Sequence, residues 1–328
     1  MSLRRVLLGL ASVALGVVLI ALLIRGGKID LRLTLHQLEG VNRIVFIKLV
    51  LLNGLLVYLS TEKWRSIDAA VRHASDPVPS RAASFAVTSA GMTLGLVLPV
   101  QLGMTAARTF GTAVYGGALK RGTAGTLFEQ SFDLLIVIFL TVASGATWVC
   151  GGGGVMWTLS AFAMTALALL AVGPSIRLVR WLASYPTRTV VRQEWIGAVL
   201  RGFSNLQHSG ALSATLSRRL VMLSAARFAV VVLMAGQTAE AIHSPISLWH
   251  LAAAIPFVVL ACVIAVTPGG LGVNELTYAS ALNFFGIPFS VGAQWALANR
   301  VLGVAACLLV AALAITLLGV KRLAAPGK

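Results

Sequence analysis

Leu98-Pro-Val-Gln-Leu-Gly103 and Thr267-Pro-Gly-Gly-Leu-Gly272 share a Pro-x-x-Leu-Gly core, 169 residues apart in the chain. Each stretch follows an apolar run and precedes Gly- and Ala-rich sequence that ends at a second glycine, Gly117 or Gly286. Proline removes a backbone donor and glycine loosens the backbone, so both residues break helices. Two broken apolar segments at matching places in two halves of a chain are a sequence pattern that points to the binding site of a membrane transporter.

The composition supports a membrane protein. Of the 328 residues, 58% are hydrophobic and only 11% are charged, and the mean hydropathy is +0.90. Because a soluble domain carries about 25% charged residues, the sequence predicts an all-α polytopic protein of the plasma (cell inner) membrane. The net charge of +16 is better explained by Lys- and Arg-rich cytoplasmic loops than by a nucleic-acid partner, which we do not expect.

Hydropathy windows of about 19 residues predict six full spans. Two further apolar stretches, 84–119 and 248–289, surround the repeated motif. The first span is interpreted as uncleaved, because it is long for the apolar region of a signal peptide. The six predicted spans are residues 6–24, 44–60, 124–147, 155–173, 219–240 and 301–319.

Positive charge indicates how the two remaining stretches cross the membrane. The segments 61–83 and 99–123 are both basic, and the run between them is short for a crossing, so 84–119 is predicted to be a hairpin from the cytoplasmic side. The arginine-rich loop 174–218 is predicted to be cytoplasmic, and the uncharged loop 241–247 to be external. The C-terminus is basic and is therefore predicted to be cytoplasmic. Since the span 301–319 alone crosses from the external side to the cytoplasm, 248–289 has to return to the external side on which it starts.

The predicted architecture is therefore six full spans plus two re-entrant hairpins, one from each side, in a single membrane domain over 1–328. This is the arrangement of an inverted repeat, with repeat-like units at 61–147 and 248–319 and with both termini in the cytoplasm. Eight plain transmembrane helices are the alternative. The basic cluster in 25–43 opposes this orientation, because it falls on the external side.

Charged residues at membrane depth are costly and usually face the bundle interior. Glu129 and Asp133 are four residues apart and share a helix face, where two carboxylates can share a proton or a cation. The alternative is a solvated pair at the interface. Arg227 lies inside its predicted span, and the paired donors of its guanidinium group match the geometry of a phosphate. The alternative for Arg227 is a structural pair with one of the carboxylates.

Three more charged residues follow the repeated motif. Glu275, directly after the second motif, suits the positive end of a helix. Arg300 either snorkels to the external interface or pairs with Glu275. Arg108, five residues after the first motif, is either part of the site or an ordinary residue of the cytoplasmic interface. The glycines of the second motif are expected to allow a tight turn with exposed backbone amides, which can bind anions. The predicted hairpin-motif residues are Pro99, Gly103, Pro268, Gly269, Gly270 and Gly272.

No catalytic constellation emerges from the sequence. The second motif is not a phosphate-binding loop, because no Lys-Ser/Thr follows it. The cysteines and histidines lack metal-ligand spacing. We therefore expect no enzymatic activity, no cofactor and no metal site.

These residues, in their order and spacing, resemble the transmembrane domain of the lysylphosphatidylglycerol synthases, which also occurs as a stand-alone flippase-like family. The resemblance implies re-entrant segments and a role in moving lipids between leaflets. This family often has an acidic residue where Thr105 stands and arginine where Gln130 and Asn274 stand. The matches are Lys63-Trp64-Arg65, Leu98-Pro99, Leu102-Gly103, Arg108, Glu129, Asp133, Pro268 to Val273, Glu275 and Arg300, over about residues 60–305.

The functional hypothesis is a lipid translocase whose partners are membrane lipids with an anionic headgroup or a polyprenyl phosphate. Arg227, Arg300 or the motif amides would hold the headgroup, and Glu275, Glu129 and Asp133 would supply charge balance or proton coupling. The alternative is an accessory subunit of a lipid or glycolipid (including hopanoid) pathway, which recruits a cytoplasmic lipid- or glycan-modifying enzyme through 174–218. Transferase activity is disfavoured, because the aminoacyl-transferase domain of the synthases is not expected here.

Overall fold

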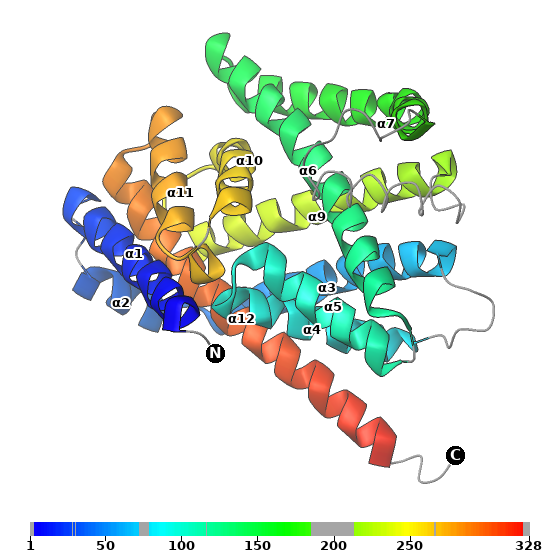
Figure 1. The fold of residues 1–328 in the computed structure, drawn as a ribbon. Coiled ribbons are helices and arrows are strands. Elements are labelled where there is room, and N and C mark those ends of the chain that lie inside the picture. Colours follow the sequence, from blue (N-terminus) through cyan, green and yellow to red (C-terminus); the bar gives the residue numbers. More distant parts are fainter. Residues whose placement is uncertain are drawn as a thin grey trace.

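The computed structural model describes residues 3–27, 29, 31–71, 79–115, 117–184, 213–265 and 267–323. Over these residues the chain is helical without strands (Figure 1). Five helices are long and apolar enough to cross a membrane: α3 (Arg43–Val71), α6 (Leu119–Val149), α7 (Gly154–Ser184), α9 (Ala214–Ala241) and α12 (Phe289–Leu323). This confirms an all-α, polytopic membrane protein.

The N-terminal segment forms α1 (Leu3–Gly27), followed by the short α2 (Leu31–Glu39). The described apolar part of α1, Ala11–Gly27, is shorter than the five long helices. α1 packs against the second repeated motif, where a Cβ atom added to Gly16 would lie 3.1 Å from Leu271. α1 therefore packs over a motif that lies in the last quarter of the sequence.

Several predicted boundaries are wrong in the same direction, because helices continue into segments that were assigned to loops. α3 runs on to Val71, α12 begins at Phe289, and α7 and α9 both extend into 174–218. Hydropathy windows stop at the first charged residues, but α3 continues because a charge beyond its apolar run, Lys63, finds a partner in Asp133 of α6 inside the bundle. Residues 185–212, the remainder of the predicted basic loop, lie outside the described residues.

The first repeated motif breaks an apolar segment into α4 (Arg81–Val97) and α5 (Val100–Val114). The two helices pack antiparallel and very closely, because a Cβ atom on Gly103 would lie only 2.3 Å from the Gly95 nitrogen. At 1.5 Å per residue they are about 25 and 22 Å long. Each is therefore shorter than the hydrocarbon core of about 30 Å, so α4 and α5 form a hairpin.

The second motif separates α10 (Leu248–Ile264) from α11 (Val273–Phe284), with the short turn η1 (Pro268–Gly270) between them. α10 and α11 also pack antiparallel, with the ring centroids of Phe257 and Phe285 6.3 Å apart. The chain then turns at Gly286, whose φ of 88° favours glycine. Both repeated motifs therefore form the tip of a helical hairpin.

The two hairpins open toward opposite ends of α6. Near the start of α6, Thr123 shares a hydrogen bond of 2.9 Å with Thr109 of α5. At the far end of α6, Trp148 stacks on Phe284 of α11, with 4.2 Å between the ring centroids. Because α6 has 31 residues and is about 46 Å long, these contacts lie on opposite sides of the bundle. The two hairpins therefore enter the bundle in opposite directions.

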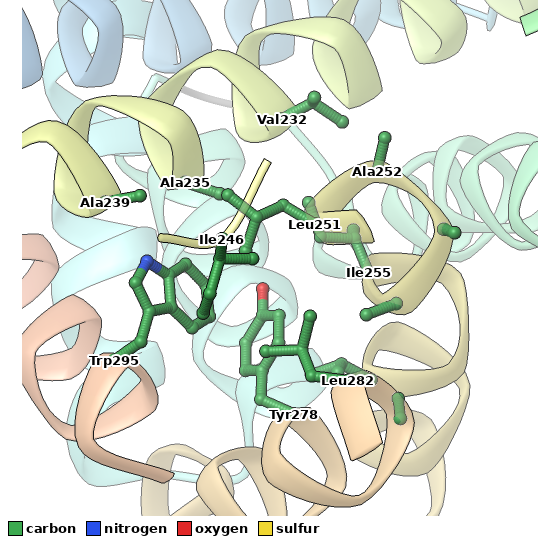
Figure 2. Close-up of a cluster of buried hydrophobic side chains, with 14 of the residues drawn as sticks. Val232, Ala235, Ala239, Ile246, Leu251, Ala252, Ile255, Tyr278, Leu282 and Trp295 are labelled. Carbon is green, nitrogen blue, oxygen red and sulfur yellow. The ribbon is translucent and has the colours of Figure 1, made fainter. Parts of the chain in front are cut away.

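The main hydrophobic core holds the second hairpin against α9 and α12 (Figure 2). Leu251 and Ile255 of α10 and Leu282 of α11 are fully buried. Tyr278 meets Trp295 of α12 edge to face at 4.9 Å. Interiors packed in this way transmit displacement rather than absorb it, so α11 is positioned firmly relative to α12.

Candidate functional site

The tips of the two hairpins touch through their backbones. The Gly269 amide of the second tip donates a hydrogen bond of 2.9 Å to the Leu98 carbonyl of the first tip. Gly269 has a φ of 56°, and a Cβ atom there would lie 2.6 Å from the Leu96 carbonyl oxygen. Only glycine fits this position, because it alone tolerates both the conformation and the close approach.

An ion pair between a buried carboxylate and a partly exposed arginine holds the second tip in shape, since the Glu275 side chain is 1% exposed and that of Arg300 is 21% exposed. Glu275 accepts a hydrogen bond of 2.7 Å from the Gly272 amide, and it pairs with Arg300 at 2.6 Å. Arg300 also donates from Nη2 to the Gly269 carbonyl at 2.8 Å. Both expectations for Glu275 are therefore met, since it caps the start of α11 and also pairs with Arg300. The pair fixes the backbone on both sides of the tip.

The expectation that the glycines of the second motif expose their amides for anion binding is wrong for Gly269 to Gly272. The Gly270 amide donates to the Thr267 carbonyl at 3.0 Å, and the Leu271 amide donates to the Pro268 carbonyl at 2.9 Å. The Gly269 and Gly272 amides are bonded to Leu98 and Glu275 as described above. The tight turn, the first tip and the glutamate therefore use the amides from Gly269 to Gly272.

A second group of charges lies on the side of α6 near the first hairpin. We call Lys63, Arg108, Glu129, Asp133 and Arg227 the charge cluster; they come from α3, α5, α6 and α9. Arg108 pairs with Glu129, and Arg227 pairs with Asp133. Lys63 bridges the two carboxylates, 2.5 Å from Asp133 and 3.8 Å from Glu129.

The charge cluster has a closed part and an open edge. The side chains of Lys63 and Arg108 are fully buried, and that of Glu129 is 3% exposed. Arg108 also donates a hydrogen bond of 3.0 Å to the Ser60 carbonyl. By contrast, the side chains of Asp133 and Arg227 are 27% and 21% exposed. The exposed edge of the cluster is therefore formed by Asp133 and Arg227.

These positions correct three sequence-based interpretations. Lys63, assigned to a cytoplasmic loop, is instead a fully buried member of the cluster. Arg108 is not an ordinary interface residue, and Glu129 is not solvated at the interface, because both are buried. The sequence did contain a signal for Lys63, because Ser60, Lys63 and Ile67 recur at helical spacing and so continue one face of the helix beyond the apolar run. All three residues are buried in the structure.

The positions at which the resemblance implied charges are neutral in this chain. Thr105 bonds the Gln101 carbonyl within α5 at 2.8 Å, and Gln130 of α6 donates to the same carbonyl at 3.4 Å. An uncharged contact thus joins the first hairpin to α6 here. The charges of the first half lie in the cluster instead. No group of three or more His, Cys, Asp or Glu side chains that could hold a metal occurs among the described residues.

Two broken-helix hairpins that meet tip to tip, each beside buried charges, define a polytopic membrane protein with the discontinuous-helix architecture found in transporters. The model of the family described as lysylphosphatidylglycerol synthase TM region matches residues 9–318, and the chain belongs to this family. The membership confirms the resemblance and indicates a lipid-related membrane function. No curated protein matches the chain.

Proposed function

We propose that the protein is a lipid translocase that moves an anionic or polyprenyl-linked lipid between the two leaflets. The observation that supports this proposal is the contact of two oppositely directed hairpins through their tips, Leu98 to Gly269. Irregular backbone at membrane depth is tolerated only where protein or a polar path satisfies it. In this proposal, parting of the tips opens such a path, and the step requires no covalent chemistry.

The two charged groups have different roles in this proposal. Glu275 and Arg300 are positioning residues, because their hydrogen bonds are used to shape the second tip. The charge cluster is the place for a headgroup, because it has an exposed edge at Arg227 and Asp133. Glu129 and Asp133 neutralise two of the three cationic residues of the cluster when no lipid is present.

We further propose that the protein lies in the plasma (cell inner) membrane with both termini in the cytoplasm. α1 ends where α12 begins, since a Cβ atom on Gly27 would lie 3.4 Å from Ala293. The first helix therefore starts, and the last helix ends, toward the other side of the bundle. Arg81, Arg121 and Arg219 lie on that side, which is the charge bias of a cytoplasmic face.

A scrambling assay tests the proposal. Purified protein is placed in vesicles that carry fluorescent anionic lipids, and a membrane-impermeant quencher reports how fast the inner-leaflet lipids become accessible. The wild type should accelerate exchange, and Glu275→Gln and Arg300→Ala should abolish the acceleration because the second tip loses its clamp. Lys48→Gln, which removes a half-exposed ion pair with Glu240, is the matched control and should behave like the wild type.

The absence of exchange for several headgroups, with protein shown to be folded by size-exclusion chromatography, would contradict the translocase. That result would favour the accessory-subunit hypothesis. Equal loss of activity in the Lys48→Gln control would show that the vesicle assay reports general damage to the protein rather than the tip contact, and it would also count against the proposal.

A further inference from the structure

Two buried oxygen atoms at the second tip have no hydrogen-bond partner among the described residues. They are Oγ1 of Thr267, a residue that is fully buried, and Oδ1 of Asn274. Thr267 lies three residues before Gly270, and Asn274 lies four residues after it. A buried polar atom without a partner is costly, and an ion or a water is the usual explanation for one.

The backbone of the tip leaves the Thr267 hydroxyl unused. A threonine at the start of a helical turn normally accepts a hydrogen bond from an amide two or three residues later. Here both of those amides have other acceptors, since Gly269 donates to the Leu98 carbonyl and Gly270 donates to the Thr267 carbonyl. The contact between the two tips therefore takes one of the amides that would otherwise satisfy the hydroxyl.

The end of α10 brings a backbone carbonyl to the same region. The position of a Cβ atom on Gly270 would lie 3.2 Å from Sγ of Cys262, in the last turn of α10, and 3.8 Å from Cβ of Asn274. In a continuing helix the Ile264 carbonyl would accept from residue 268, but Pro268 has no amide hydrogen. Among the described residues no other amide beyond the helix donates to this carbonyl. The end of α10 is also the negative end of its dipole.

The charge balance of the second tip favours a monovalent cation. Side-chain amide oxygens and backbone carbonyls are ligands for hard cations, but a divalent ion is usually bound by carboxylates as well. The carboxylate of this tip, Glu275, is already paired with Arg300 at 2.6 Å. In transporters with broken helices, unwound carbonyls and the C-terminal ends of half-helices coordinate Na⁺.

We propose that the second tip contains a Na⁺ site formed by Oγ1 of Thr267, Oδ1 of Asn274 and the carbonyl end of α10. The cysteine and histidine spacing does not bear on this site, because its ligands are neutral oxygens. Bound Na⁺ ties the end of α10 to the start of α11 and so holds the tip in the shape that contacts Leu98. The site goes beyond the proposed function, since it supplies an ion to which parting of the tips is coupled.

Sodium-dependent thermal stability of the full chain tests the site independently of transport. Purified protein in detergent is heated in sodium chloride, potassium chloride or choline chloride at equal ionic strength, and the midpoint of unfolding is followed by circular dichroism. The midpoint of the wild type should rise with the Na⁺ concentration, whereas the other two salts should leave it unchanged. At about 100 times its dissociation constant, Na⁺ raises the ratio of folded to unfolded protein about 100-fold.

Three variants locate the ion. Thr267→Val and Asn274→Leu remove one oxygen ligand each and keep a side chain of similar shape, and each should weaken Na⁺ binding about 10-fold or more. In choline chloride, Thr267→Val should be at least as stable as the wild type, because the hydroxyl that it removes has no partner among the described residues. Thr88→Val on α4 is the matched control, since its hydroxyl is also buried without a described partner, and it should keep the full response to Na⁺.

An equal rise of the wild-type midpoint in potassium chloride would overturn the inference, and this comparison needs no variant to fold. An unchanged Na⁺ response in both Thr267→Val and Asn274→Leu would overturn it as well, because the ion would then bind elsewhere. Stabilisation by Na⁺ without any scrambling would refute the translocase and leave the site in place. Scrambling at the same rate in sodium and choline chloride, without a Na⁺ response of the midpoint, would refute the site and leave the translocase in place.

Discussion

The contact between the two hairpin tips predicts a large effect of a single methyl group at Gly269. Gly269→Ala places a Cβ atom 2.6 Å from the Leu96 carbonyl oxygen, in a residue whose φ is 56°. Gly286→Ala is the matched control, because its φ is 88° but nothing lies within 4 Å of the added atom. Both substitutions carry the strain of a positive φ, about 1–2 kcal/mol.

Only Gly269→Ala adds overpacking, about 1–3 kcal/mol, and loss of the hydrogen bond to Leu98, about 0.5–1.5 kcal/mol. We therefore expect its free energy of unfolding to fall about 1.5–4.5 kcal/mol further than that of Gly286→Ala. Titration with a denaturing detergent in mixed micelles, followed by circular dichroism, measures both values. Equal losses in the two variants would refute the reasoning, because they would show that the tips are not in contact.

Three further outcomes follow from the helix packing and the ion pairs. Glu129→Gln should destabilise the protein by about 3–5 kcal/mol, because it strands buried cationic groups, whereas Lys48→Gln should change stability by less than about 1 kcal/mol in the same titration. Gly103→Ala should lower the thermal midpoint of unfolding, because the added methyl group would force the closely packed helices α4 and α5 apart. Gly145→Ala, with nothing near its Cβ position, should leave the midpoint unchanged or raise it. The exposed Cys150 should react with an impermeant maleimide in intact cells; labelling only after lysis would reverse the proposed orientation.

Pattern and composition were enough to predict the broad architecture. Pro99 and Pro268 predicted both breaks, because the loss of a backbone donor is a local property that the sequence shows directly. The contact of Leu98 with Gly269 was beyond reach, because it joins residues far apart in the chain through backbone atoms that every sequence contains. The repeated motif predicted two hairpins that enter from opposite sides, but it did not predict that their tips would be in contact.

The candidate site was predicted in part. The pairing of Glu275 with Arg300 was among the alternatives, and the shared face of Glu129 and Asp133 was correct. Lys63 was missed because a lysine after an apolar run is read as a loop charge, and its burial depends on carboxylates contributed by another helix. Hydropathy places each charged residue from its own segment alone, whereas its burial in the bundle depends on partners from other helices.

The packing of α1 on the second tip has a consequence for biosynthesis. Gly16 lies against Leu271, so α1 leaves the ribosome some 255 residues before the partner that it packs against. At about 5–20 residues per second, that delay is on the order of tens of seconds. The Leu98 carbonyl likewise has no Gly269 amide to accept a hydrogen bond from until 171 further residues have been translated. The nascent chain therefore needs water, lipid headgroups or an insertion factor to shelter its first hairpin until the last one arrives.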